Sequence, residues 1–69
     1  MKSYTEAEMI ALLRQKADAR SQTQVAEEIG FTKQFINDVL NGRRDFSANL
    51  ALAMGFEKLP DRFIRKVNP

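Results

Sequence analysis

The sequence predicts a mainly α-helical fold, in which four to five short helices pack compactly. Three observations lead to this class. A Ser or Thr suited to cap a helix occurs at four places: Thr5, Ser21, Thr32 and Ser47. Apolar residues follow each of them at helical spacing, and a glycine follows most of the resulting segments. With 69 residues, 43% apolar and 29% charged, residues 1–69 are expected to form one domain.

The composition excludes several classes of protein. Cys and His are both absent, so disulfides and the usual metal ligands are missing, and neither a metal nor a cofactor is expected. Without these residues or a glycine-rich phosphate loop, enzyme activity is not expected. No apolar run is long enough for a membrane, and no signal peptide opens the chain, so a cytoplasmic location is expected. A core this small supplies about 3–5 kcal/mol, which favours oligomerisation.

The first helix is expected over about residues 6–18. Thr5 and Glu8 have the spacing of a capping box, and Tyr4 and Met9 have that of a hydrophobic staple. Its apolar face would comprise Met9, Leu12, Leu13 and Ala17.

The second helix follows a second capping box, Ser21 to Gln24. Its inner face is Val25, Ala26 and Ile29, and Gly30 ends it, because glycine adopts the left-handed conformation at low cost.

Thr32 is expected to cap the third helix, which ends at Asn41-Gly42 and has Ile36, Val39 and Leu40 on its apolar face. Only Gly30-Phe31-Thr32 separates this helix from the second one, so the two must cross steeply. That arrangement is a helix-turn-helix motif, over about residues 21–41. Small Ala26 would allow the close approach of the two helices.

Ser47 is expected to begin a fourth helix that Gly55 ends. The remaining segment, residues 56–69, has two interpretations. Pro60 is suited to begin a fifth helix, whose apolar face would be Phe63, Ile64 and Val67. Alternatively the segment is a strand, with Leu59, Phe63 and Val67 on one side and Arg62 and Lys66 on the other. Its short length and strand-forming residues favour the strand. In either form, residues 56–69 are a candidate dimerisation element.

The charge is unevenly distributed along the chain. Residues 1–35 carry five basic and five acidic residues, so the formal net charge of +2 lies in residues 36–69. A basic half indicates an anionic partner.

Residues 21–56 resemble the lambda-repressor and Cro type of phage and bacterial helix-turn-helix regulators. The resemblance lies in Gln22, Val25-Ala26, Ile29-Gly30, the Thr-capped third helix, and Asn41-Gly42 followed by basic residues. It implies a homodimeric, Cro-like repressor that binds palindromic operator double-stranded DNA and requires no small-molecule ligand. A phage, prophage or plasmid setting and repression by promoter occlusion are implied as well.

In this family the second helix of the motif lies in the major groove, with two copies roughly 34 Å apart. Lys33 and Gln34, on its first turn, are therefore expected to contact bases, because Lys donates to guanine and Gln pairs with adenine. Asn37 and Asp38, one turn further, are the other expected base contacts. Asp38 would accept from cytosine, or orient Lys33 or Gln34. The expected contacts to the DNA backbone are Gln22, Thr32, Asn41, Arg43 and Arg44.

Phe35 departs from the family, which often has a small or polar residue there. It would either touch a thymine methyl group or fold back onto Val39 or the loop that carries Arg43 and Arg44, called the arginine loop below. Simpler interpretations also exist: Lys33 and Gln34 as solvated residues, and Arg43-Arg44 as charges that stabilise a helix end. A rival function is an antitoxin, whose C-terminal segment would order only on its partner.

Overall fold

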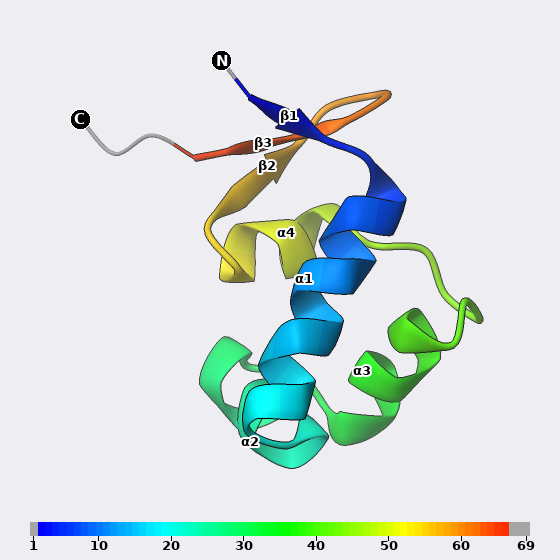
Figure 1. Ribbon diagram of the computed structural model, residues 1–69, viewed down its shortest axis with the longest axis vertical. Helices are drawn as coiled ribbons and strands as arrows, with labels where there is room; N and C mark the ends of the chain where they lie inside the picture. The colour runs from blue at the N-terminus through cyan, green and yellow to red at the C-terminus, as the bar shows by residue number, and fades with distance from the viewer. Residues whose placement is uncertain (1, 67–69) are drawn as a thin grey trace.

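The computed structural model describes residues 2–66 (Figure 1). Four helices and three short strands are formed within this range. In chain order they are β1 (Ser3–Tyr4), α1 (Glu6–Ala19), α2 (Gln22–Ile29), α3 (Lys33–Leu40), α4 (Ala48–Ala53), β2 (Phe56–Lys58) and β3 (Phe63–Arg65). The mainly helical class is therefore confirmed. None of the helices within residues 2–66 combines the length and the apolar content that crossing a membrane requires.

All four predicted caps are formed. The hydroxyl oxygens of Thr5, Ser21, Thr32 and Ser47 each accept a hydrogen bond from the backbone N–H three residues later, at 3.0–3.1 Å. At Thr5 the capping box is complete, because the Glu8 carboxylate accepts from Thr5 N at 2.9 Å. The second predicted box is only half formed among the described residues. Ser21 accepts from Gln24 N, but no bond returns from the exposed Gln24 amide, for which water is an alternative partner.

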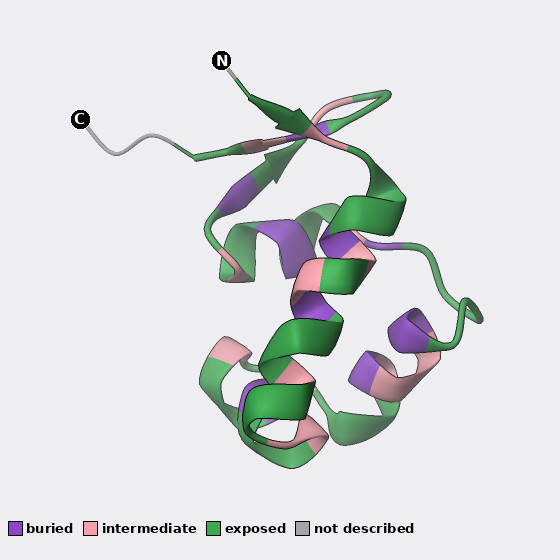
Figure 2. Cartoon of the chain, in the orientation of Figure 1, coloured by how far each residue is buried: buried purple, intermediate pink, exposed green. Residues whose placement is uncertain are grey.

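The core forms where the apolar faces of the helices and the sheet meet (Figure 2). α1 contributes Met9 and Leu13, which are fully buried, and α4 contributes Leu50 and Ala51. The buried apolar residues of the other elements and the loop before α4 are Val25, Ala26, Ile36, Val39, Leu40, Phe46, Phe56 and Phe63. Phe46, Phe56 and Phe63 are thus core residues.

The turn between α2 and α3 depends on Gly30, whose φ of 79° lies in the left-handed region. The N–H groups of Gly30 and Phe31 both donate to the Ala26 carbonyl, which closes the end of α2. Ala26 itself is 3% exposed, as expected for a small residue between close helices. Figure 1 shows α2 at the lower end of α1 and α3 to the right of α1, joined to α2 by a short connection, as in a helix-turn-helix motif.

The C-terminal segment forms a hairpin within the described residues, so the strand interpretation is correct and the fifth helix is not formed. β3 lies between β1 and β2 and pairs antiparallel with both. The expectation of one continuous strand is wrong, because Leu59 N donates to Arg62 O at 2.7 Å around Pro60-Asp61. Proline favours such a turn, since it fixes φ and lacks an N–H group. Val67 lies outside the described residues.

A charge pair marks the tip of this hairpin. Arg62 donates to both carboxylate oxygens of Asp61, at 2.9 and 3.1 Å. This hydrogen bonding, with the positive charge of Arg62, holds the pKa of Asp61 below its usual value. The Asp61 carboxylate in turn raises the pKa of Arg62.

β1 was not expected from the sequence. Tyr4 pairs with Phe63 of β3, and its ring lies edge-on to Phe56, with 5.3 Å between ring centroids. A two-residue strand has no periodicity to detect, and its partner lies about sixty residues further along the chain.

Candidate nucleic-acid interface

α3 presents a polar face to solvent because its apolar residues are buried in the core. Ile36 and Val39 are fully buried and Leu40 nearly so. Lys33 and Gln34 lie on the opposite side of the first turn, and both are exposed. Among the described residues, no ion pair involves the Lys33 ammonium group. The two residues of the first turn that are expected to contact bases are therefore accessible.

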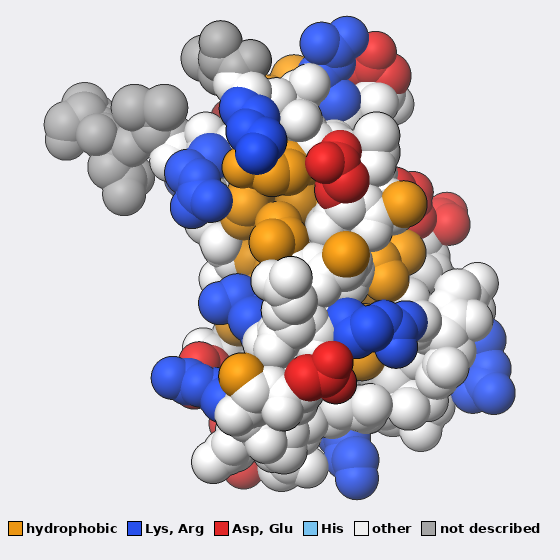
Figure 3. Space-filling view, viewed as in Figure 1, with side chains coloured by type: hydrophobic (Ala, Val, Ile, Leu, Met, Phe, Trp, Pro, Cys, Tyr) orange, Lys and Arg blue, Asp and Glu red, His pale blue; other side chains and the backbone are white. Residues whose placement is uncertain are grey.

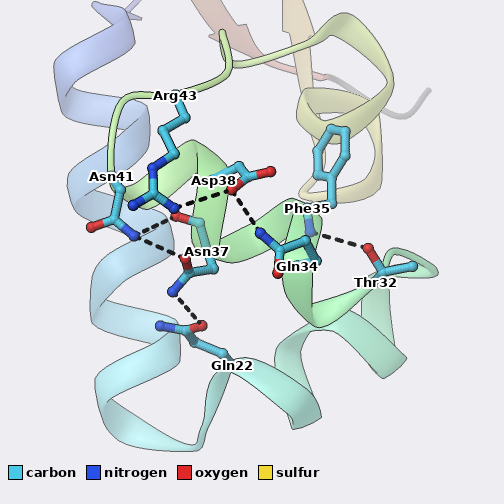
Figure 4. A network of polar contacts seen from close by, with 8 residues as sticks. All are labelled: Gln22, Thr32, Gln34, Phe35, Asn37, Asp38, Asn41 and Arg43. Atoms are coloured by element: carbon cyan, nitrogen blue, oxygen red, sulfur yellow. Dashed lines mark hydrogen bonds and ion pairs between the residues drawn. The ribbon is translucent and has the colours of Figure 1, made fainter.

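Asp38 links Gln34 to the arginine loop (Figure 4). Gln34 Nε2 donates to Asp38 Oδ1 at 2.9 Å, and Arg43 Nη1 lies 3.7 Å from the same oxygen. The Asp38 side chain is 19% exposed and that of Arg43 68% exposed. Asp38 thus holds the Gln34 amide, one of the alternatives considered for it, while the Arg43 guanidinium remains accessible.

A second chain of polar contacts joins α2 to the end of α3 (Figure 4). Asn37 Nδ2 donates to Gln22 Oε1 at 3.3 Å. Asn41 Nδ2 donates to both the backbone carbonyl and Oδ1 of Asn37, at 2.8 and 3.0 Å. Gln22 and Asn37 are half-buried and Asn41 is exposed. Three of the expected site residues are therefore brought together as amides in contact.

Phe35 lies against the arginine loop, one of the alternatives considered for it. The Arg44 guanidinium carbon is 4.7 Å from the centroid of the Phe35 ring, within the range of a cation–π contact. Phe31 packs on the same ring, with 4.8 Å between centroids. The backbone N–H of Phe35 donates to Thr32 Oγ1 at 3.0 Å, so the Thr32 hydroxyl retains its own hydrogen as a donor.

Arg14 supports the site, and the sequence did not single it out. From α1 its Nη2 donates to the Leu40 carbonyl at 2.9 Å, at the end of α3. The last carbonyls of a helix have no partner within the helix, and a cation there is favourable. Arg14 therefore ties the end of α3 to α1. Only the folded chain reveals this, because 26 residues separate the two groups.

A groove of about 370 Å³ lies away from this interface. It is lined by residues of α1, the hairpin and the end of α4: Leu12, Gln15, Lys16, Ala19, Met54, Phe56 and Arg65. None of them belongs to α2 or α3. Figure 3 shows apolar side chains in the upper half of the molecule, with basic side chains beside them. Within residues 2–66, no group of three or more His, Cys, Asp or Glu side chains is placed to hold a metal ion.

The fold and this exposed face define a helix-turn-helix protein. A family model described as helix-turn-helix matches residues 10–54, which run from within α1 to the end of α4. The chain belongs to this family, the lambda-repressor and Cro type, whose members are DNA-binding regulators. No curated protein and no solved structure matches the chain.

Proposed function

We propose that this protein is a sequence-specific repressor that binds a palindromic operator as a homodimer, with residues 1–69 as one non-enzymatic, cytoplasmic domain. α3 enters the major groove and α2 crosses the DNA backbone. The observation that carries this proposal is the first turn of α3. There an ammonium group and an amide are exposed together, on a helix anchored from within by buried Ile36 and Val39.

Lys33 and Gln34 suit different bases. Lys33 donates to the O6 and N7 acceptors of guanine. Gln34 uses one hydrogen of Nε2 for Asp38, which leaves the second hydrogen and Oε1 for N7 and N6 of adenine. The contact with Asp38 supports this pairing, because it restricts the amide before DNA arrives.

The surrounding residues supply contacts to phosphate. The Arg43 and Arg44 guanidinium groups follow α3 and are exposed. Arg44 stacks on Phe35 through its face, which leaves the N–H groups at its edge to donate. Thr32 and Gln22 provide neutral donors from the starts of α3 and α2. With about three or four phosphates neutralised by each subunit, log affinity falls against log salt with a slope of roughly −5 to −7.

Dimerisation is proposed through residues 56–69. Among the described residues β2 is an edge strand with one unpaired side, and such a side is a template for pairing with a second chain. Phe56 and Arg65 of the same hairpin line the apolar groove. The hairpin also favours the dimer over the antitoxin interpretation, because β3 already pairs with β1 and β2 of its own chain.

Selection of binding sites from random double-stranded DNA tests the proposal. The expected result is a two-fold symmetric site with half-sites one helical turn apart, about 34 Å, so that two copies of α3 fill successive major grooves. Repression then follows by occlusion of the promoter. Absence of any enriched sequence at low salt would contradict sequence-specific DNA binding. Enrichment of a single half-site would contradict dimerisation but not DNA binding.

A further inference from the structure

Three amide side chains lie in series between the end of α3 and the start of α2 (Figure 4). Asn41 Nδ2 donates to the Asn37 carbonyl at 2.8 Å and to Asn37 Oδ1 at 3.0 Å. Asn37 Nδ2 then donates to Gln22 Oε1 at 3.3 Å, the longest of the three bonds. The series therefore starts at a backbone group and ends at a residue expected to contact phosphate.

The direction of each amide in this series is determined by its neighbour. A backbone carbonyl can only accept hydrogen bonds, so Asn41 must turn its nitrogen toward Asn37 O. The same nitrogen meets Asn37 Oδ1, so the Asn37 nitrogen must face Gln22. Gln22 consequently turns its oxygen inward. Without such an anchor the two ends of an amide have nearly the same shape, and both orientations are accessible.

The two ends of the series offer different groups to an anion. Both hydrogens of Asn41 Nδ2 have acceptors in Asn37, so Asn41 presents an acceptor oxygen outward. A phosphate only accepts, so this oxygen is unsuited to it. In Figure 4 the contact from Asn37 meets the Gln22 oxygen, and Gln22 Nε2 takes part in none of the hydrogen bonds described for residues 2–66. Its two hydrogens are what a phosphate requires.

We infer that Asn37 and Asn41 are positioning residues that fix the orientation of the Gln22 amide, so that it meets the DNA backbone as a donor. This role replaces the base contact expected for Asn37 and the phosphate contact expected for Asn41. It rests on the proposed function, because it assumes that Gln22 contacts DNA. With the amide reversed, Gln22 would present an oxygen to the phosphate and weaken binding.

The orientation of the amides is testable in the free protein. Asn41→Ala removes the anchoring donor, and the ordinary backbone of Asn41 (φ −94°) accepts alanine. The side-chain NH₂ resonances of both Asn37 and Gln22 are expected to shift in ¹H–¹⁵N NMR spectra without DNA. As a control, Asn49→Ala on the exposed face of α4 leaves both unchanged. A shift at Asn37 alone, with Gln22 unaffected, would show that Asn41 does not fix the orientation of the Gln22 amide through Asn37.

A double-mutant cycle tests the effect on DNA. Gln22→Ala is expected to weaken binding of a selected site about tenfold per subunit, the loss of one hydrogen bond to a charged group. Asn41→Ala weakens it by no more than this, and the double variant binds like Gln22→Ala alone. If Asn41 contacted phosphate itself, the losses would multiply to about a hundredfold. That result, or full affinity of Asn41→Ala, would overturn the inference.

Failure of this inference differs from failure of the proposed function. If the parent protein binds selected DNA but the two losses multiply, the regulator stands and the positioning role is wrong. If the parent protein binds no DNA, both the proposed function and the DNA role of Gln22 are wrong. The NMR measurement decides the amide orientation in either case.

Discussion

Asp38 is an acidic residue on a helix proposed to approach phosphates, and its contacts explain how this is tolerated. Its Oδ1 atom faces the Gln34 amide and the Arg43 guanidinium, and its side chain is only 19% exposed. The negative charge is therefore directed at a donor and a cation of the same chain. What a single side chain can offer to DNA therefore depends on which of its atoms already form contacts within the protein.

Gln34→Ala is expected to cost about 1–3 kcal/mol of binding free energy and to relax the preference at one base pair. The reason is the loss of a bidentate pair with one base edge. The measurement is binding-site selection for both proteins, with Gln24→Ala, exposed on α2, as a matched control. An unchanged preference at every position would remove Gln34 from base recognition.

Arg43→Ala is expected to weaken binding to all sequences alike, and to reduce the steepness of the salt dependence by about one unit per subunit. The cause is the loss of one phosphate contact, which carries no sequence information. Titrations at several salt concentrations measure it. Arg20→Ala is the matched control, since Arg20 is also paired with an acidic residue, Glu28, but lies at the end of α1, outside the proposed contacts. Equal slopes for Arg43→Ala and the parent would show that Arg43 does not contact phosphate.

The helix-turn-helix element is held at its two ends by different means. Ser21 and Thr32 cap the starts of α2 and α3, and Gly30 provides the turn between them. Arg14 fixes the far end of α3 through the Leu40 carbonyl. The orientation of α3 relative to α1 therefore combines local capping with one contact from a distant helix.

Gly30→Ala is expected to destabilise the fold by about 1–2 kcal/mol, because a Cβ atom disfavours the left-handed conformation. A Cβ atom there would meet nothing within 4 Å, so the cost comes from the backbone alone. Denaturant unfolding measures it. Gly30→Asn is expected to cost less, since Asn adopts this conformation more readily. Equal stability of the alanine variant and the parent would show that the turn relaxes to another conformation.

The whole molecule depends on a core that joins the helices to the sheet. Phe46, in the loop before α4, is fully buried and meets Phe63 of β3 edge-on, with 5.4 Å between ring centroids. Lys58 Nζ donates to the Phe46 carbonyl at 3.1 Å, and Phe46 N donates to Glu6 Oε2 at 3.3 Å. Sheet, loop and α1 thus converge on one residue.

Phe46→Ala is expected to cost about 3–5 kcal/mol, the size of the whole stability of a domain this small. The variant is therefore expected to be largely unfolded at 25 °C, as circular dichroism would show. Leu52→Ala is the control, because Leu52 is 47% exposed and its loss should change stability by no more than about 0.5 kcal/mol. A cooperative unfolding transition near that of the parent would show that the core repacks around position 46.

The parts of the site predicted from sequence are those that depend on helical periodicity. Lys33 and Gln34 follow a cap, so their place on the first turn and their exposure could be inferred. Which partner Asp38 would contact could not be inferred, and the structure shows that it is the Gln34 amide. Phe35 illustrates the limit. From the sequence its ring could lie against DNA, Val39 or the arginine loop, and only the structure shows it against Arg44 of that loop.

By itself the sequence determined the four helices, their caps, the glycine turn and the family. These depend on interactions between residues three or four apart, whose spacing is visible in the chain. The tertiary structure decided the three-stranded sheet, the contact of Arg14 with α3 and the orientation of the Gln22 amide. Each of these joins groups that are distant in sequence, and the packing of the core brings them within hydrogen-bonding distance.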